Sequence, residues 1–402
     1  MKVGIGIFTA PEAGGAYQYT RSIIQAAAVI TADNRSESKS VEFICYSLFE
    51  MWKPICEHIG VPFKKLSETK IQKVLYHCGY LMGQIGPYDS KFYNSRFYKY
   101  HPLWKAYDED KLDLMLITSP SWYGKPEGKK LVMPIFDVMH RYIDFPEIGE
   151  GKIGAERDRR YASICKGADA ILADSKVGVM QIIQCYDDVC EGLIKKVYSL
   201  PFIVPDYVYD NMESAEEKCA LSTKVPEKYI LYPAQFWKSK NHVNLLRAIG
   251  ELKLQGIQIN LVLTGSRKNA MNDIERVVGE YELDSQVINL GYISDEELVW
   301  LYENARAMVF PSYVGPTNIP PLEAMMLGCP VAVSDNYAMP EQINGAGLTF
   351  NPFSVADIKD VVRRLWTDDV LCEKLAKKGI ERSKEWTVKE FADELKKILY
   401  YN

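Results

Sequence analysis

The stretch from Val309 to Val331 constrains the fold of this chain most; it reads V-F-P-S-Y-V-G-P-T-N-I-P-P-L-E-A-M-M-L-G-C-P-V. An apolar run ends at Phe310, a polar loop follows, and Pro320-Pro321 fit the first turn of a helix, where proline's missing N–H costs no hydrogen bond. The free N–H groups and the dipole of such a helix attract an anion such as phosphate. We expect Glu323 in that first turn, where its carboxylate can accept hydrogen bonds from two ribose hydroxyls. The stretch therefore predicts a nucleotide site.

The same stretch resembles the donor signature of the retaining glycosyltransferases of the GT-B fold, family 4, which reads E-G-F-G-L-P-P-L-E-A-M-A-x-G-x-P-V. Residues 315–331 read G-P-T-N-I-P-P-L-E-A-M-M-L-G-C-P-V. Glu323 matches the second glutamate of the signature, whereas Gly315 stands where the first glutamate would contact the donor sugar. The resemblance implies that Glu323 keeps the ribose role. It also implies donor contacts from the loop before it, at Thr317, Asn318 and Ile319.

The overall composition is that of a soluble protein with more than one domain. The 402 residues are 47% hydrophobic and 25% charged, and a chain of this length can hold two domains of about 200 residues each. The net charge of −5 argues against nucleic acid as a partner, because general nucleic-acid binders carry a basic excess.

The cysteines and the apolar runs indicate a cytoplasmic protein. The nine cysteines are odd in number and form no C-x-x-C pair, so we expect reduced thiols and no structural zinc. The N-terminus enters a short apolar strand rather than a signal peptide, and no apolar run reaches the roughly 18 residues of a spanning helix. We expect a cytoplasmic location, with peripheral contact at the inner face of the membrane as the alternative.

Two strand–loop–helix patterns predict two Rossmann-like domains. The first pattern occupies residues 1–31, and the second restarts at 229–233 after a proline-containing linker at 197–209. We expect an α/β chain of the GT-B type, whose two Rossmann-like domains face each other across a deep cleft. The predicted ranges are 1–205 for the acceptor-side domain and 206–387 for the donor domain, with a C-terminal helix at about 388–402 that packs back on the first domain, as the resemblance implies.

The loop at 234–241 predicts a diphosphate site in the donor domain. Two lysines between a strand and an apolar-periodic helix make an anion-binding arrangement, in which Lys240 can neutralise a diphosphate. The matching family element, G-R-x-x-x-x-K-G, implies an arginine where this chain has Gln235. Lys238 or Arg267 can supply the missing charge. The alternative is that these lysines only solvate the start of the helix.

Two further loops of the donor domain follow predicted strands. Gly265 and Arg267 follow the strand at 257–264, where Arg267 either faces the diphosphate or is simply exposed. Tyr292 follows the strand at 287–290, and the resemblance implies that it lines the nucleotide base; packing against the domain is the alternative. Ser294, with Glu297 three residues on, predicts a capped helix start.

The first domain contributes two candidate elements. Gly14 and Gly15 lie in the loop after the first strand, where they form a tight turn or bring the backbone close to a ligand; the resemblance favours the ligand. Asp137 and His140 follow the strand at 131–136, where ligand groups gather in open α/β sheets. They match the family segment H-D-L-x-H, with Phe136 in place of its first histidine. A lone histidine is more often structural, but this position favours a catalytic role.

The segment 88–107 interleaves aromatic and basic residues. It could contact a membrane interface or the acceptor, or it could form a helix whose rings pack inward while its lysines are solvated. Nucleic acid is a third reading, which the net charge disfavours.

The features of the sequence predict a nucleotide-diphosphate site in a two-domain chain, and the family resemblance implies a retaining hexosyltransferase-type glycosyltransferase (EC 2.4). It would move a sugar from a nucleotide-diphosphate donor to a glycan, a lipid-linked glycan or another hydroxyl acceptor, in surface polysaccharide or glycoconjugate synthesis. No protein nucleophile, cofactor or metal is expected, because the mechanism needs mainly positioning and charge stabilisation, with Lys240 facing the leaving diphosphate.

Two alternatives belong to other classes. One is a catalytically weak GT-B subunit that binds a nucleotide sugar and supports a partner transferase, as the changes at Gly315 and Gln235 suggest. The other is a nicotinamide-dependent oxidoreductase or epimerase. The first glycine loop, A-P-E-A-G-G-A, argues against this class because it lacks a G-x-G-x-x-G fingerprint.

Overall fold

The computed structural model describes residues 1–10, 14–33, 40–75, 100–121, 124–149, 151–212, 220–315 and 317–401. The chain forms two compact units. The first comprises Met1–Tyr142, Gly151–Phe202 and Val388–Asn402, and the second comprises Ile143–Glu150 and Ile203–Thr387. The C-terminal residues therefore group with the first unit. Residues 143–150 group with the second unit, although they lie inside the range 1–205 that the sequence assigns to the first domain.

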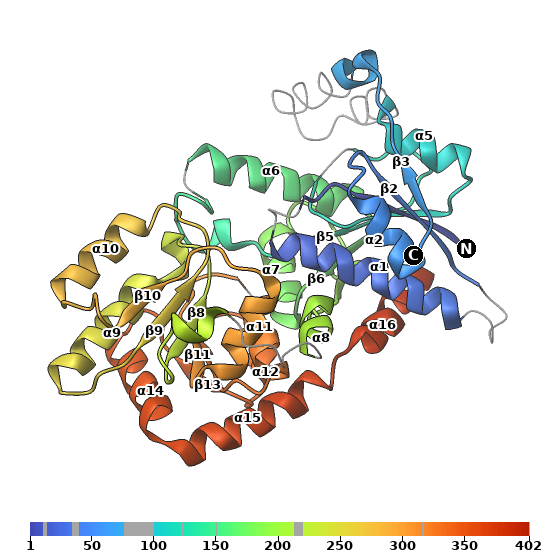
Figure 1. Cartoon of the computed structure of the whole chain (residues 1–402). Helices are drawn as coiled ribbons and strands as arrows, with labels where there is room; N and C mark the ends of the chain where they lie inside the picture. The colour runs from blue at the N-terminus through green and yellow to red at the C-terminus, as the bar shows by residue number, and fades with distance from the viewer. Residues whose placement is uncertain are drawn as a thin grey trace. The chain divides into compact units, whose positions relative to one another are not determined.

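The first unit is built on a parallel sheet whose seven described strands run in the order β3-β2-β1-β4-β5-β6-β7 (Figure 1). The inner strands are buried throughout most of their length, so helices must cover both faces. Helix α16 packs alongside α1. The strands are β1 (Lys2–Ile7), β2 (Glu42–Ser47), β3 (Phe63–Lys65), β4 (Leu114–Ile117), β5 (Leu131–Pro134), β6 (Ala170–Ala173) and β7 (Val197–Ser199). The helices are α1 (Gly15–Asp33), α2 (Trp52–Ile59), α5 (Pro102–Glu109), η4 (Met139–Arg141), α6 (Lys152–Gly167), α7 (Lys176–Tyr186), η5 (Leu193–Lys195) and α16 (Val388–Tyr401).

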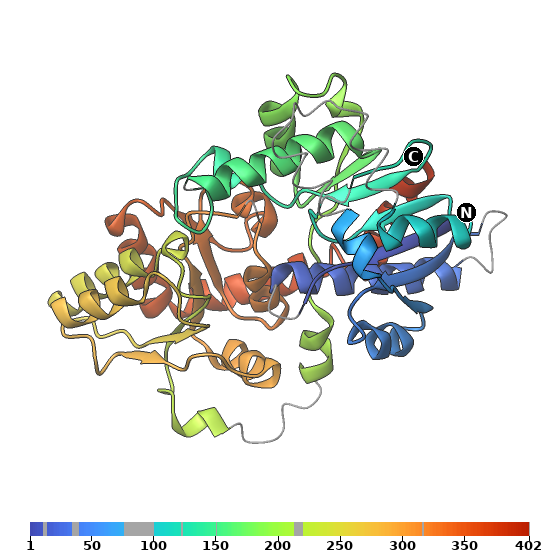
Figure 2. The same ribbon diagram turned by 90° about the horizontal axis from the view of Figure 1, so that it is seen from above.

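The second unit repeats this plan with six described strands in the order β10-β9-β8-β11-β12-β13, again all parallel. Helices α9 and α10 lie side by side (Figure 2). The strands are β8 (Ile230–Pro233), β9 (Leu261–Thr264), β10 (Val287–Asn289), β11 (Ala307–Phe310), β12 (Val331–Ser334) and β13 (Leu348–Phe350). The helices are α8 (Asp206–Met212), η6 (Ala220–Thr223), η7 (Lys238–Lys240), α9 (His242–Leu254), α10 (Met271–Glu280), α11 (Asp295–Asn304), α12 (Ile319–Met326), α13 (Met339–Ile343), α14 (Val355–Thr367) and α15 (Asp369–Ser383).

Both sheets have the strand order of a doubly wound Rossmann fold. The chain reverses direction across the sheet between β1 and β4 in the first unit, and between β8 and β11 in the second. In such sheets, ligands bind outside the carboxyl ends of the strands at this switch point. The loops that follow β8 and β11 are therefore the expected ligand-binding loops of the second unit.

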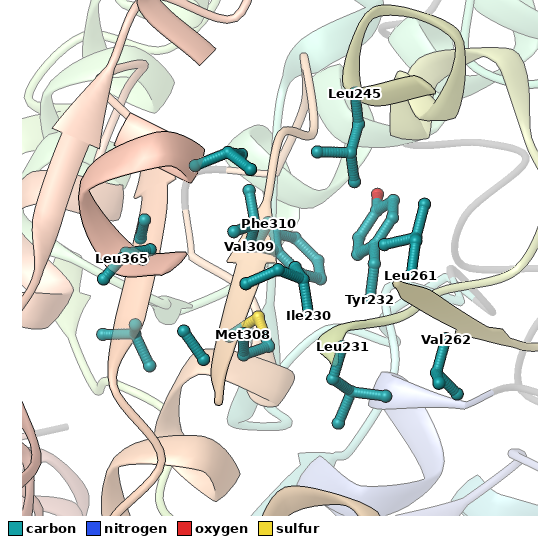
Figure 3. Close-up of a cluster of buried hydrophobic side chains, with 14 of the residues drawn as sticks. Ile230, Leu231, Tyr232, Leu245, Leu261, Val262, Met308, Val309, Phe310 and Leu365 are labelled. Carbon is teal, nitrogen blue, oxygen red and sulfur yellow. The ribbon is translucent and has the colours of Figure 1, made fainter. Parts of the chain in front are cut away.

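The core of the second unit holds β8 and β11 in place. Apolar side chains from these strands, from β9 and from the helices on the sheet form one buried cluster (Figure 3). Tyr232 at the end of β8 meets Phe310 at the end of β11 edge to face, with ring centroids 5.3 Å apart. The predicted capping box is confirmed, because Ser294 and Glu297 bond reciprocally at the start of α11. In the part of the chain that is described, no helix is both long and apolar enough to cross a membrane.

The packing of α9 on Tyr281 predicts opposite effects for two glycine-to-alanine changes. Alanine in a helix is normally more stable than glycine by about 1 kcal/mol. A Cβ at Gly250 in α9, however, would lie 2.3 Å from Cγ of Tyr281, whereas a Cβ at Gly279 in α10 would meet no described atom within 4 Å. We expect Gly250→Ala to lower the free energy of unfolding and Gly279→Ala to leave it unchanged or raise it, as measured by urea titration. A higher unfolding midpoint for Gly250→Ala would contradict this packing.

Candidate functional site

The loops after β8 and β11 bring together two of the residues predicted from the sequence. Lys240 Nζ donates a hydrogen bond to Asn318 Oδ1 at 3.0 Å, and the same ammonium lies 5.3 Å from the centroid of the Phe310 ring. The two residues are 78 positions apart in the chain. Because these loops lie at the switch point of the sheet, a positive charge stands where a ligand is expected.

The backbone around Lys240 is held by groups from three parts of the second unit. The Tyr232 hydroxyl donates to the carbonyl of Lys240 at 2.5 Å. Asn241, which stands where the family has glycine, has a φ of 59°, in the left-handed region that asparagine tolerates better than most residues. Its buried amide donates to the carbonyls of Pro311 and Pro352. These bonds fix the point from which the lysine side chain extends.

Pro320 and Pro321 lie in the first turn of α12, as predicted, but this helix start offers fewer free N–H groups than expected. The helix begins at Ile319 with Asn318 as its N-cap residue, so Pro320 and Pro321 occupy the second and third helical positions and have no N–H to donate. The backbone N–H of Asn318 is already bonded to Oε1 of Gln342 at 3.2 Å, and its carbonyl accepts from Nε2 of Gln342 at 2.6 Å. Attraction of an anion here depends on Lys240 and the helix dipole more than on a row of free N–H groups.

The side-chain amide of Asn318 completes this corner of the site. Its Oδ1 faces Lys240, while its Nδ2 is buried and has no hydrogen-bond partner among the described residues. A buried donor without a partner is costly, so a ligand oxygen at Nδ2 would be stabilising. Gln342, which orients Asn318, was not predicted from the sequence because it lies one strand and one helix further along the chain.

Glu323 lies deeper than the first-turn position expected for it. It is the fifth residue of α12 and is 4% exposed. Its carboxylate accepts hydrogen bonds from the hydroxyls of Tyr302, at 2.7 Å, and Tyr207. Burial raises the pKa of Glu323 to about 7, and the two tyrosines only partly offset this. Neither tyrosine was predicted as part of the site, since nothing in the sequence links them to α12.

Gln235, which stands in place of the arginine, and the two residues expected to supply its charge all have partners in the structure. Gln235 accepts a hydrogen bond from the Trp237 indole at 2.8 Å. Lys238 lies 3.7 Å from a carboxylate oxygen of Asp273. Arg267 pairs with Glu275 at 2.8 Å. Both ion pairs are largely exposed, and such pairs contribute little to stability, so an arriving anion could compete for either cation.

Gly265 and Tyr292 show contrasting surroundings. Gly265 has a φ of 144°, and a Cβ there would lie 2.4 Å from the carbonyl oxygen of Ala234. The glycine is therefore required for the close approach of the loops after β8 and β9. Tyr292 is 86% exposed, so its ring is available to stack on a base rather than packed into the domain.

In the first unit, His140 lies in a compact polar cluster. Its Nε2 is 3.1 Å from the Tyr186 hydroxyl and 3.3 Å from Oδ1 of Asp158, and Arg141 also bonds Asp158. The imidazole side chain is 2% exposed, and burial lowers its pKa despite the neighbouring carboxylate. Asp137 accepts the N–H of Met139 at 3.0 Å, so its carboxylate is bonded to the first residue of the η4 turn that carries His140.

Only some of the remaining residues predicted for the first unit lie in the described part of the chain. Gly14 has a φ of 56°, and its carbonyl accepts the N–H groups of Tyr17 and Gln18, so it caps α1, which begins at Gly15. Residues 88–99 of the basic-aromatic segment lie outside the described residues. In its described part, Trp104 and Tyr107 of α5 are buried. Across the described residues, no group of three or more His, Cys, Asp or Glu side chains could hold a metal ion.

Part of the second unit is similar to a known protein family. The family described as Glycosyl transferases group 1 matches residues 214–382, the part of the chain that contains Lys240, Asn318 and Glu323. This match covers less than half of the chain.

Two sequence relatives extend the comparison. The chain is 29% identical over 227 residues to the serotype-specific mannosyltransferase WbdA of Escherichia coli, covering 55% of this chain and 27% of that protein. It is 31% identical over 160 residues to O-antigen chain mannosyltransferase B of Escherichia coli, covering 40% of this chain and 42% of that protein. The chain thus spans less than half the length of these relatives.

Solved structures match the whole chain. Anabaena Alr3699/HepE, in complex with UDP and glucose, superposes with a TM-score of 0.68 at 13% identity and covers 100% of both chains. WaaG, a glycosyltransferase involved in lipopolysaccharide biosynthesis, superposes with a TM-score of 0.62 at 14% identity and covers 99% of both chains. The predicted fold class, α/β with two Rossmann-like domains of the GT-B type, is therefore confirmed.

The burial of Glu323 predicts a specific pH dependence of stability. Its carboxyl has a pKa of about 7 in the folded state against an ordinary value of 4.5, so its contribution to stability is complete below pH 4.5 and is lost as the pH rises through 7. We expect the unfolding free energy of the wild type to fall relative to that of Glu323→Gln by up to roughly 3 kcal/mol between pH 5 and pH 8. Urea titrations at several pH values measure this difference.

The control is Glu227→Gln, which changes an exposed glutamate of the same unit and should show no comparable trend with pH. A difference between wild type and Glu323→Gln that stays constant across the pH range would show that Glu323 does not titrate in this window.

Proposed function

We propose that this chain is a retaining glycosyltransferase of GT-B family 4 that transfers a hexose from a nucleotide-diphosphate donor to a glycan or other hydroxyl acceptor. The observation that carries the proposal is the Lys240 ammonium beside Asn318 at the switch point of the second sheet, inside the part of the chain that matches the glycosyltransferase family. The two relatives named mannosyltransferases favour mannose as the donor sugar and a surface polysaccharide as the product.

In the proposed reaction the diphosphate leaves from the donor sugar while the acceptor hydroxyl attacks from the same face. Lys240 neutralises the charge that builds up on the leaving diphosphate, and the proton of the acceptor passes to a leaving oxygen. A fixed cation in a partly dry site stabilises this charge without reorganising at the moment of reaction. The mechanism needs neither a protein nucleophile nor a metal, and it suits a cytoplasmic enzyme with access to nucleotide sugars.

The Asn318 side chain supports the proposal that it replaces the missing first glutamate. A Cβ on Gly315 would lie 2.8 Å from Nδ2 and 3.0 Å from Oδ1 of Asn318, and the φ of Gly315 is 94°. A glutamate at 315 would therefore be strained and would displace the amide. We propose that the amide contacts the donor sugar through Nδ2, which has no hydrogen-bond partner in the described part of the chain, while Glu323 and Tyr292 contribute to ribose and base recognition.

One set of contacts favours a second candidate, a nucleotide-sugar-binding subunit with little activity of its own. Gln235 provides no positive charge where the family has arginine, and Lys238 and Arg267, the residues expected to supply that charge, are both paired with carboxylates. Acceptor-dependent release of nucleoside diphosphate by the purified chain would exclude this candidate. A thermal-shift screen against a panel of nucleotide sugars, with mannose and glucose donors included, identifies the donor to use, because binding to the folded state raises its melting point.

Removal of the Lys240 ammonium should weaken donor binding. We expect Lys240→Ala to reduce the affinity for the best nucleotide sugar of the screen by about tenfold or more, or about 1.4 kcal/mol, as measured by isothermal titration calorimetry. Lys224→Ala removes an exposed lysine of the same unit and should bind like the wild type. Equal affinities for Lys240→Ala and Lys224→Ala would refute the diphosphate role of Lys240.

His140 should affect transfer without affecting donor binding. Its buried imidazole belongs to the first unit, and Asp137 bonds the first residue of the turn that carries it. We expect His140→Ala to keep the donor affinity and to lower the rate of acceptor-dependent diphosphate release by about tenfold or more. The expected loss can be smaller than the roughly 10²–10⁴-fold of a general acid or base, because the acceptor proton passes to a leaving oxygen. Normal turnover per folded molecule would mean that His140 only supports the Asp158 cluster.

A further inference from the structure

Residues 143–150, here called the inserted segment, belong to the second unit although first-unit residues flank them on both sides in the chain. The Phe145 ring stacks on the Tyr313 ring, with centroids 5.6 Å apart and planes at 20°. Tyr313 in turn stacks on Phe353, with centroids 4.8 Å apart and planes at 27°. Offset aromatic pairs of this kind contribute beyond their buried area, so the inserted segment is anchored to the second unit close to the loop after β11.

The second anchor of the inserted segment is the carboxylate of Glu147. Its Oε1 accepts the backbone N–H of Ser239 at 2.8 Å, and its Oε2 accepts Nδ2 of Asn269 at 2.8 Å. The Oδ1 of Asn269 accepts the backbone N–H of Lys238 at 2.9 Å. One carboxylate and one amide therefore hold two consecutive backbone N–H groups at the start of η7, directly before Lys240.

Both anchors act on Ser239, the residue next to Lys240. Glu147 holds its N–H, while its carbonyl accepts the N–H of Tyr313 at 2.9 Å and the Ser312 hydroxyl at 3.4 Å. Ser239 is 3% exposed, so water could not easily replace these partners. Burial opposes ionisation of Glu147, but the hydrogen bonds from Ser239 and Asn269 outweigh it and lower the pKa of its carboxyl.

We propose that Glu147 is a positioning residue for glycosyl transfer: together with Asn269 it fixes the η7 turn so that Lys240 points at Asn318 and at the donor diphosphate. This role rests on the proposed function of the site. Glu147 itself does not touch the donor; it acts through the backbone of Ser239. Its negative charge is taken up by the hydrogen-bond donors of Ser239 and Asn269.

The directions of these hydrogen bonds allow a direct test of whether Glu147 holds the η7 turn. In Glu147→Gln, one carboxylate oxygen becomes an NH2 group, which must face either the N–H of Ser239 or the NH2 of Asn269, and both are donors. Adding Asn269→Asp restores every bond with one direction reversed. The new amide at position 147 accepts from Ser239 and donates to the new carboxylate at position 269, which still accepts from Lys238. The net charge of the double variant equals that of the wild type.

The experiment compares the wild type, Glu147→Gln, the double variant Glu147→Gln/Asn269→Asp, and the control Glu227→Gln. Amide hydrogen exchange of the peptide covering residues 236–241 reports on the turn without reference to activity. Titration calorimetry with UDP and with GDP as probes reports on diphosphate binding. We expect Glu147→Gln to exchange at least about tenfold faster in this peptide and to bind the nucleoside diphosphate about tenfold more weakly, and the double variant to return within about threefold of the wild type on both measures.

Three outcomes would overturn the proposal. In the first, Glu147→Gln exchanges and binds as the wild type does. In the second, the turn exchanges faster but the affinity is unchanged. In the third, the double variant remains as impaired as the single variant, or both variants fail to fold. Glu147 would then be needed for the stability of the fold and not for positioning Lys240. If the wild type binds neither UDP nor GDP, the proposed function fails, while the exchange rates still decide whether Glu147 holds the turn.

Discussion

The meeting of Lys240 and Asn318 at the carboxyl ends of β8 and β11 is the contact on which the rest of the site depends. It requires the two strands to be neighbours in register, which the buried parallel sheet enforces. It also requires both loops to be held rigidly, since a lysine side chain has many rotamers. The hydroxyl of Tyr232, the amide of Asn241 and the side chain of Gln342 supply this rigidity through hydrogen bonds that are buried or partly buried.

The charge that Glu323 and Glu147 carry depends on how each carboxyl group is buried and hydrogen-bonded. The carboxylate of Glu323 is enclosed by two tyrosine hydroxyls, and its pKa near neutrality means that it carries only part of a charge at pH 7. Glu147, in contrast, is held as an anion by two N–H donors. The Lys240 ammonium donates a hydrogen bond to a neutral amide oxygen, that of Asn318.

Local sequence patterns predicted the fold and the loops in which Lys240 and Asn318 meet. Alternating strand and helix patterns led to two Rossmann-like domains, and the Ser294–Glu297 spacing predicted a capped helix that the structure confirms. The position of Lys240 followed from its place between a strand and a helix. Glu323 was predicted in the first turn because two prolines mark a helix start, but the helix begins one residue before them, at Ile319, which places Glu323 beyond that turn.

Long-range contacts escaped prediction because no local pattern encodes them. Glu147 bonds a residue 92 positions away, and Tyr302 bonds one 21 positions away; both are ordinary residues in their own segments. The most direct measurement is the structure of the chain with its nucleotide-sugar donor bound. The proposed function predicts a diphosphate oxygen at about 3 Å from Lys240 Nζ, the distance of a charge-assisted hydrogen bond. A bound donor whose diphosphate lies away from Lys240, with Lys240 still on Asn318, would contradict it.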